Sequence, residues 1–332
     1  CMYERDYRRC GCSIKGVCIM SLLFVEGFDH YAIADLAKKW SAQSSTLCEI
    51  RNTSGRRAGA IYLAVTQNTA GRYVQTTLPG NFATLVIGFA FCVIDWPSQN
   101  VPVIVSLRDA GAAQVELRLN IDGTLVVTRN GTALTGGTST AVLSSGAWNY
   151  IEWKVTIADS ISAGSCKVRV NGVDVITVNT GQDTKDTTNA YVNSLRLGWG
   201  AANYGTIPTF CYDDLYVCST SGSTNNDFLG DCRVDTLFPS ADGTYSDFTP
   251  STGTTHYTLV DETSLNTTDY NSGSAANQKD TYVLQDLPVI ASSTVYGIQV
   301  NAAVTKSDAG TRTSATLVRY GGSDVAGTTF GL

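Results

Sequence analysis

Cysteine is the residue type in this sequence with the most evident chemistry, and four cysteines stand near its start: Cys1, Cys10, Cys12 and Cys18. Their spacing lacks the paired C-x2-C knuckles of structural zinc sites, and it does not match an iron–sulfur centre. The four cysteines fit disulfide formation better than they fit a metal site. Cys10 and Cys12 flank Gly11 and point to opposite sides of an extended chain, so they would seek different partners. We therefore predict inter-subunit disulfide cross-links for some of the four, with free thiols or closure of the segment onto its own subunit as the alternatives.

The other six cysteines are spread along the chain. Cys92 lies in an apolar run and is predicted to be a buried small hydrophobe. Cys211 and Cys218 lie too far apart along one predicted strand to bond each other. One of them is predicted to form a bridge to Cys232, while the pairing of Cys48 and Cys166 stays open.

Carboxylates are the next candidates for chemistry. Glycan-cleaving enzymes place two carboxyl groups about 5–10 Å apart around the scissile bond. Alternating acidic residues on a strand would supply that pair, and the sequence has none. Asp213 and Asp214 are adjacent and would point to opposite faces of a strand. The two histidines, His30 and His256, have no nucleophile elbow near them, and no phosphate-binding loop is present. We therefore predict a protein that is not an enzyme and needs no cofactor.

The elements around these residues are predicted to be strands. In WNYIEWKVTI, residues 148–157, apolar and polar side chains alternate, which indicates a strand with one buried face. The pairs Asp122-Gly123, Asn130-Gly131 and Asn171-Gly172 favour two-residue type I′ hairpin turns. Only YAIADLAKKW, residues 31–40, has helical spacing. The apolar stretch around Met20 is predicted to be a first strand and not an export signal.

Composition limits the classes of partner. Charged residues make up 16% of the 332 residues and the formal net charge is −6, so there is no basic face for nucleic acid. No apolar run reaches the ~18 residues of a membrane-spanning helix. The Ser-, Gly- and Asn-rich residues 219–228 are predicted to be a linker. The predicted domains are an N-terminal extended arm (1–19), a β-sandwich (20–218) and a smaller β-rich domain (229–332).

Several of these segments together resemble a known family. SLLFVEGFDHY, WNYIEWKVTI, KVRVNGVDVITV, LRLGWG and YDDLYV are similar to the concanavalin A-like or LamG-type jelly roll of tailed-bacteriophage virion proteins. The stretch FLGDCRVDTLFPSADGTYSDF resembles the segment that follows that jelly roll. The resemblance implies an all-β fold and a structural part of the virion, on the surface of the phage particle.

The resemblance also implies a function and partners. We expect a minor capsid or decoration protein, or a collar or neck protein, whose arm contacts other virion proteins such as the major capsid, neck or tail chains. A homo-oligomer is expected, with a trimer preferred. Because the host cytosol is reducing, the cross-links would form after lysis.

A host-glycan adhesion module on a tail fibre or particle surface is the alternative function. LamG-like and lectin jelly rolls bind sugars or calcium at one rim of the sandwich. On that basis the candidate rim ligands are Asn203, Asp213 and Asp214.

Overall fold

The computed structural model describes residues 2–3, 21–30, 32–44, 48–53, 55–57, 62–66, 71–98, 101–159, 163–199, 208–263, 266–287 and 293–332. It divides into two compact units. The sandwich unit comprises Ile19–Phe28 and Leu36–Arg233, and the C-terminal unit comprises Cys1–Cys18, Asp29–Asp35 and Val234–Leu332. Cys1, Cys10, Cys12 and Cys18 lie outside the described residues, so the arm and its cross-links stay predictions.

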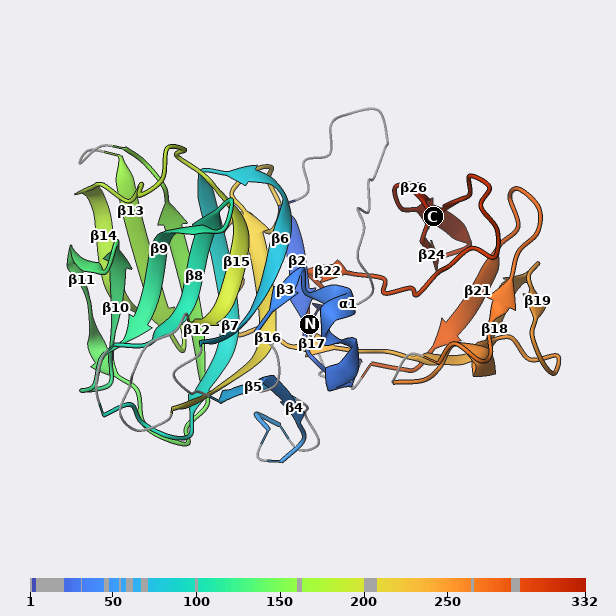
Figure 1. Cartoon of the computed structure of the whole chain (residues 1–332), viewed down its shortest axis with the longest axis horizontal. Helices are drawn as coiled ribbons and strands as arrows, with labels where there is room; N and C mark the ends of the chain where they lie inside the picture. The colour runs from blue at the N-terminus through green and yellow to red at the C-terminus, as the bar shows by residue number, and fades with distance from the viewer. Residues whose placement is uncertain are drawn as a thin grey trace. The chain divides into compact units, whose positions relative to one another are not determined.

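The sandwich unit consists of two antiparallel sheets that face each other (Figure 1). The first sheet has seven strands, in the order β11 (Thr132–Val142), β10 (Thr124–Arg129), β9 (Ala112–Leu119), β8 (Val103–Asp109), β15 (Val192–Trp199), β6 (Arg72–Phe82) and β3 (Ala42–Gln43). The second has eight, in the order β14 (Val173–Gln182), β13 (Gly164–Val170), β12 (Asn149–Thr156), β7 (Thr84–Val93), β16 (Thr209–Ser219), β5 (Tyr62–Thr66) and β4 (Cys48–Arg51), with β2 (Leu22–Glu26) also paired to β16. The predicted all-β jelly-roll sandwich is confirmed.

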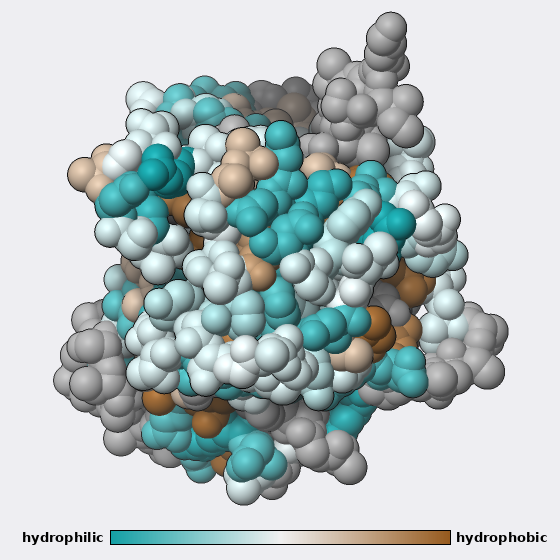
Figure 2. All heavy atoms as spheres, turned by 90° about the vertical axis from the view of Figure 1, so that its right-hand side faces the viewer, coloured by the Kyte–Doolittle hydropathy of each residue, from teal (hydrophilic) through white to brown (hydrophobic). Residues whose placement is uncertain are grey.

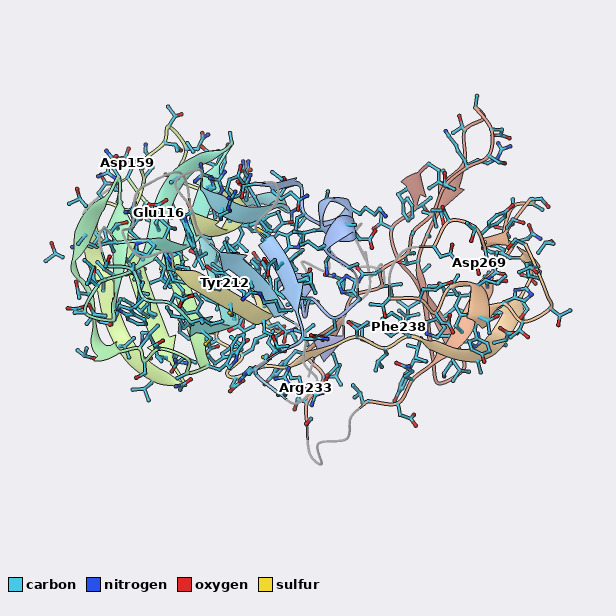
Figure 3. All side chains as sticks on the ribbon, turned by 60° about the horizontal axis from the view of Figure 1, so that its bottom comes forward. Glu116, Asp159, Tyr212, Arg233, Phe238 and Asp269 are labelled. Atoms are coloured by element: carbon cyan, nitrogen blue, oxygen red, sulfur yellow. The ribbon has the colours of Figure 1, made fainter. Side chains whose placement is uncertain are left out.

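Alternating side chains fill the space between the two sheets. Ile151, Trp153 and Val155 on β12 are at most 1% exposed, as the alternation predicts. Tyr212 also lies between the sheets (Figure 3) and its hydroxyl donates to the Ile104 carbonyl on the opposite sheet at 2.9 Å. Burial of these large side chains is the main stabilising contribution, at about 25 cal/mol per Å² of apolar area.

Two of the three predicted type I′ turns are present. Asn130 and Asn171 have φ of 46° and 51°, and the glycine after each also has a positive φ. A type I′ turn requires positive φ at both central residues. The turn at Asp122-Gly123 differs, because the Asp122 carboxylate accepts from the Thr124 backbone N–H at 3.0 Å and Asp122 itself keeps a negative φ. The predicted helix is a 3-10 turn (η1, Ile33–Asp35) followed by α1 (Leu36–Lys39).

Residues 219–228 belong to the sandwich unit, which ends only at Arg233. The predicted linker is held on the sandwich by side chains of β12 and β13. Lys154 forms an ion pair with Asp227 at 3.1 Å, and the Arg169 guanidinium lies 4.2 Å from the centre of the Phe228 ring. The domain boundary therefore falls after Arg233, and polar composition alone did not identify it.

The C-terminal unit is β-rich, as predicted, but its strands are short. Its sheets are a parallel sheet of β17 (Val234–Asp235), β1 (Met2–Tyr3) and β22 (Gly297–Ile298), and four antiparallel pairs: β18 (Pro239–Ser246) with β21 (Asp280–Leu284), β19 (Thr249–Pro250) with β20 (Asn271–Ser272), β23 (Thr313–Ser314) with β26 (Phe330–Gly331), and β24 (Leu317–Tyr320) with β25 (Ser323–Ala326). A 3-10 turn, η2, covers Tyr257–Leu259. Among the described residues, no helix has the length and hydropathy that crossing a membrane requires.

Candidate functional site

A row of polar side chains crosses the outward face of the seven-stranded sheet. Strand register places Gln75, Arg196, Ser106, Glu116 and Thr128 opposite one another on β6, β15, β8, β9 and β10. The residues that alternate with them, such as Val74, Leu195 and Leu107, are fully buried in the core. Period-2 alternation thus directs five polar groups from five strands to one surface.

Arg196 is held flat on this surface. Its guanidinium lies 3.7 Å from the centre of the Tyr73 ring, and its Nε donates to Gln75 Oε1 at 3.1 Å. Burial lowers the pKa of Arg196, and the positive charge of Arg108 lowers it further. No carboxylate of the described residues forms an ion pair with Arg196, so its charge is only partly compensated.

Arg108 is a second arginine on the same face. Its guanidinium donates to Ser106 Oγ at 3.1 Å and to the Gly111 carbonyl. Its Nε is buried and has no hydrogen-bond partner among the described residues. Burial also lowers the pKa of Arg108. Since the register pairs Ser194 with Arg108 and Ser106 with Arg196, the two arginines lie on neighbouring strands, offset by one pleat.

Glu116 is the acidic member of the row, and it is already neutralised. Its Oε2 lies 2.5 Å from Nη2 of Arg118 on the same strand. The face therefore carries more positive than negative charge, on a chain whose net charge is −6. An anionic or hydroxyl-rich ligand suits such a surface.

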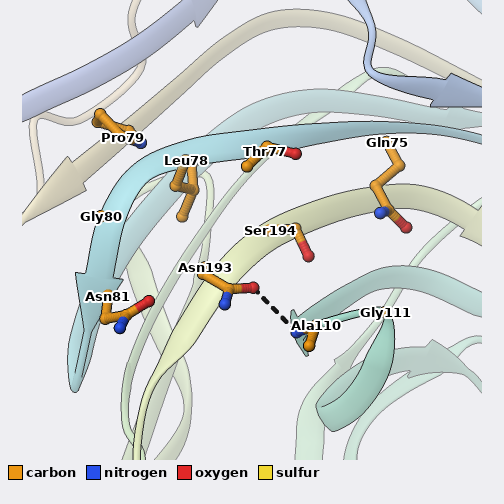
Figure 4. A pocket seen from close by; sticks show the side chains of 10 residues that line it. All are labelled: Gln75, Thr77, Leu78, Pro79, Gly80, Asn81, Ala110, Gly111, Asn193 and Ser194. Atoms are coloured by element: carbon orange, nitrogen blue, oxygen red, sulfur yellow. Dashed lines mark hydrogen bonds between the residues drawn. The ribbon is translucent and has the colours of Figure 1, made fainter.

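An open pocket of 560 Å³ (Figure 4) is lined in part by Gln75 and Ser194, the register partners of Arg196 and Arg108. Ser194 is 4% exposed and its hydroxyl has no partner among the described residues. Thr77 and Asn81 are exposed on β6. The pocket is lined by Gln75, Thr77, Leu78, Pro79, Gly80, Asn81, Ala110, Gly111, Asn193 and Ser194. It offers hydroxyl and amide groups and no carboxylate.

The β8–β9 turn forms one wall of the pocket and is firmly fixed. Ala110 and Gly111 have φ of 45° and 91°, the left-handed region that alanine rarely adopts. The Ala110 N–H donates to Asn193 Oδ1 at 3.1 Å (Figure 4). The buried Asp109 carboxylate in turn accepts from Thr187 at 2.7 Å and Asn189 at 3.0 Å. The wall is therefore positioned before any ligand arrives.

The predicted rim ligands lie elsewhere. Asp213 and Asp214 are buried on β16, at 1% and 0% exposure, and not at an exposed rim. The two Asp214 oxygens accept from Arg56 at 2.7 Å and from Arg57 at 2.6 Å, so this carboxylate stabilises the fold. Asn203 lies outside the described residues. Within the described ranges, no group of three or more His, Cys, Asp or Glu side chains could hold a metal ion.

The six cysteines that the structure describes are free and buried. The predicted bridge from Cys211 or Cys218 to Cys232 is therefore absent, and Cys48 and Cys166 are unbridged. Burial raises the pKa of Cys48, Cys166, Cys211 and Cys232 to about 12 in each case, and that of Cys92 to about 11. These thiols are packing groups, as predicted for Cys92.

The sequence analysis predicts no residue of the polar face or of the pocket. Gln75, Arg108 and Arg196 come from three strands far apart in the chain, and only strand register brings them together. The local signal was weak: an arginine at an outward position of an alternating strand usually marks a solvated face.

No protein-family model and no curated protein matches the sequence. Solved structures of β-sandwich proteins match at low similarity. The cellulose-induced protein Cip1 has 13% identity and a TM-score of 0.41, with 58% of this chain and 97% of that chain covered. Alginate lyase Aly36B has 12% identity and a TM-score of 0.43, with 61% and 98% covered. Domain 4 of AbnA, an extracellular arabinanase from Geobacillus stearothermophilus in complex with arabinotriose, has 12% identity and a TM-score of 0.42, with 60% and 93% covered.

Proposed function

We propose that the sandwich unit is a saccharide-binding module, whose site is the pocket around Ser194 together with Arg108 and Arg196. The observation that carries the proposal is the pair of partly buried arginines on neighbouring strands, neither of them bonded to a carboxylate of the described residues. Because neither guanidinium is bonded to a carboxylate of the described residues, both can bind ligand oxygens through charge-assisted hydrogen bonds.

Saccharides that carry carboxylates are the class that this site suits best. A uronate carboxylate would accept hydrogen bonds from the guanidiniums, and the ring hydroxyls would bond to Ser194, Thr77 and Asn81. The Arg196 guanidinium covers one face of Tyr73, so this aromatic ring offers less open area for stacking on a neutral sugar. We expect a neutral oligosaccharide to bind more weakly than an acidic one of equal length.

Binding without turnover is part of the proposal. Hydrolysis of a glycosidic bond uses two carboxyl groups that flank the bond. Glu116 is the only carboxylate in the row of polar side chains on the outward face of the seven-stranded sheet, and Arg118 holds it in an ion pair. The proposal thus excludes hydrolysis by a carboxylate pair on this face, and a protein that is not an enzyme stays a prediction.

Calorimetric titration of the full chain with acidic and neutral oligosaccharides tests the proposal. The variants are Arg196→Gln and Arg108→Gln, with Arg51→Gln as the control, because Arg51 pairs with Glu49 on β4 of the other sheet. We expect each test variant to weaken binding of a uronate oligosaccharide at least tenfold, because a hydrogen bond to a charged group contributes about 1.5–3 kcal/mol. We expect the control to bind as the wild type does. Absence of binding to both classes at millimolar concentration, or an equal loss in the control, would overturn the proposal.

A structural role in a phage virion is the second candidate. It rests on the sequence resemblance, and one observation favours it: the chain that leaves the sandwich is fastened by buried groups. The fully buried Glu152 accepts from the Gly230 N–H at 2.8 Å, and Arg56 donates to the Cys232 carbonyl at 3.1 Å. A fastening of this kind suits a part of a particle that must withstand mechanical stress. Electrophoresis of purified particles with and without reductant tests it, because covalent fastening through the N-terminal cysteines gives a high-mass band that reductant removes.

A further inference from the structure

Two of the buried cysteines of the sandwich unit lie directly opposite each other. Strand register pairs Cys92 on β7 with Cys211 on β16, which are neighbouring strands in the middle of the eight-stranded sheet. In the strands that the structure describes, no other two cysteines are register partners. Cys48 pairs with Val65, Cys166 with Val155 and Val178, and Cys218 with Leu22 and Val86. Among the described strands, only Cys92 and Cys211 are thus placed for a cross-strand disulfide.

The backbone spacing of this pair suits a disulfide. The Ile94 N–H donates to the Thr209 carbonyl at 3.0 Å, so these two residues form a hydrogen-bonded pair of the antiparallel ladder. Cys92 and Cys211 follow two positions further along the same register, and they form a pair of the same kind because the two kinds alternate. The Cα atoms of such a pair lie about 5.5 Å apart, within the span of about 4.4–6.8 Å that a disulfide requires. The bond therefore needs no displacement of the strands.

The side chains of the pair need a small adjustment. Cβ atoms that lie directly opposite each other are about 4.5–5.5 Å apart, with hydrogen-bonded pairs at the wide end of this range. A disulfide joins Cβ atoms that are about 3.5–4.5 Å apart. The bond would draw the two Cβ atoms about 1 Å closer together. The resulting strain makes a disulfide easier to reduce.

Apolar side chains enclose the two thiols. Cys92 is 4% exposed and Cys211 is 1% exposed, and they form one hydrophobic cluster with Ala64 on β5, against which Trp148 packs. Burial raises the pKa of Cys92 to about 11, and burial followed by the neighbouring Cys92 raises the pKa of Cys211 to about 12. The two thiols are therefore neutral packing groups in the reduced, folded protein. Cys92 is the last residue but one of β7, so local opening of the strand end gives an oxidant access to the pair.

We propose that Cys92 and Cys211 are a redox site, a dithiol that a low-molecular-weight disulfide such as oxidised glutathione converts to a reversible cross-strand disulfide. One cysteine thiolate attacks a sulfur atom of the oxidised glutathione, and one glutathione leaves as its thiolate. The other cysteine thiolate attacks the cysteine sulfur of this mixed disulfide, and the second glutathione leaves. The two thiol protons pass to the two glutathione thiolates. The cysteines lose two electrons, and the oxidant becomes two molecules of reduced glutathione. This inference does not depend on saccharide binding.

Oxidation at this site stabilises the sandwich unit. Cys92 and Cys211 are 119 positions apart in the sequence, and a cross-link that closes a long loop restricts the unfolded chain. Residues 234–332 contain no cysteine, and Figure 2 shows mostly polar side chains on the face of the molecule where they lie. The proposed bond therefore acts on the sandwich unit and leaves this part of the chain unmodified.

Disulfide mapping of the full chain tests the proposal. The reduced protein is unfolded in guanidinium chloride and refolded in a buffer of reduced and oxidised glutathione. N-ethylmaleimide then blocks the free thiols, and the protein is digested for mass spectrometry without reduction. We expect a peptide that contains Cys92 to be joined to a peptide that contains Cys211. An excess of reduced glutathione should reopen this bond, because it is strained.

Urea unfolding of two variants separates this pair from the other thiols. We expect the wild type to unfold at a higher urea concentration after oxidative refolding than in its reduced form. Cys211→Ala should abolish the part of this shift that the Cys92–Cys211 bond causes. Cys166→Ala is the matched control, because Cys166 is 2% exposed and has only valines as register partners. This control should keep the full shift.

Five results would overturn the proposal. They are alkylated Cys92 and Cys211 after oxidative refolding, a bond from either of them to another cysteine such as Cys232, a glutathione adduct in place of the bond, a bond that excess reduced glutathione leaves closed, and an equal shift in Cys211→Ala and Cys166→Ala. The mapping uses the wild type, so it decides the proposal even where Cys211→Ala does not fold.

Discussion

The Tyr216 hydroxyl on β16 donates to Glu152 Oε1 on β12 at 2.5 Å, although β7 runs between these two strands. The register places Gly88 of β7 opposite both residues. A Cβ at Gly88 would lie 2.0 Å from Tyr216 Cε1, so the ring crosses β7 only because this position has no side chain. The same hydroxyl accepts from the Leu229 N–H at 3.1 Å. Burial, and then the charge of Glu152, raise the pKa of Tyr216, so the phenol remains a proton donor.

We predict that Gly88→Ala destabilises the sandwich unit by about 1–3 kcal/mol or more, because the added methyl group overlaps the Tyr216 ring. Urea unfolding followed by tryptophan fluorescence measures the change. In a Tyr216→Ala background the same substitution should cost much less, and this double-mutant cycle isolates the contact. Gly80→Ala is the control, since the nearest atom to its added Cβ lies at 3.6 Å. Equal costs in the two backgrounds would contradict the prediction.

The sandwich was predictable from the sequence because its signals are local. Alternation in residues 148–157 identified β12, and Asn171-Gly172 identified the β13–β14 turn. Alternation does not predict the burial of Glu152. Alternation places it on the outward face, yet it is 1% exposed because residues 219–233 cover that face. Nothing in the Ser- and Asn-rich composition of the covering segment signals that contact.

The candidate site could not be predicted, for a related reason. Arg108 and Arg196 lie 88 positions apart in the sequence, and they become neighbours only when β8 pairs with β15. Asp213 and Asp214 are adjacent acids, and the family resemblance predicts them at a ligand-binding rim. The structure places Asp214 at a β-bulge with φ of 52°, where two arginines neutralise it. A charged pair in a sequence does not show whether its partner is a ligand or a buried cation.

We predict that Asp214→Asn destabilises the protein by about 3 kcal/mol, the lower end for breaking a buried ion pair, because Arg56 and Arg57 lose the carboxylate they share while Arg56 keeps its ion pair with Asp231. Asparagine tolerates a positive φ, so the substitution tests the charge and not the backbone conformation. Asp174→Asn is the control. Asp174 pairs with Lys167 and Arg169 at the surface, where such pairs contribute about 0–1 kcal/mol. Chemical denaturation of the two variants measures the difference, and similar losses in both would show that Asp214 is not a buried electrostatic centre.

We predict that Ala110→Asn stabilises the protein slightly, by about 0.5–1 kcal/mol, because asparagine adopts the left-handed conformation more readily than alanine does. The backbone N–H of residue 110 would keep its bond to Asn193 Oδ1. Thermal unfolding measures the change. Ala112→Asn on the adjacent strand is the control and should be neutral or destabilising, since asparagine is disfavoured in strands. A lower melting temperature for Ala110→Asn would show that this turn is not strained.

The last prediction concerns the thiols. Burial raises the pKa of Cys48, Cys166, Cys211 and Cys232 to about 12, so at pH 8 only about one in ten thousand of these side chains is a thiolate, the reactive form. We expect iodoacetamide at pH 8 to leave them, together with Cys92 and Cys218, unmodified in the native protein and to modify all six in guanidinium chloride. Peptide mass spectrometry after a timed exposure measures both states. Native modification of any of the six at the rate of a free peptide thiol would contradict the buried positions. If the prediction holds, a cross-link that reductant removes from purified particles must involve Cys1, Cys10, Cys12 or Cys18, because no other thiol of the chain is accessible in the folded protein.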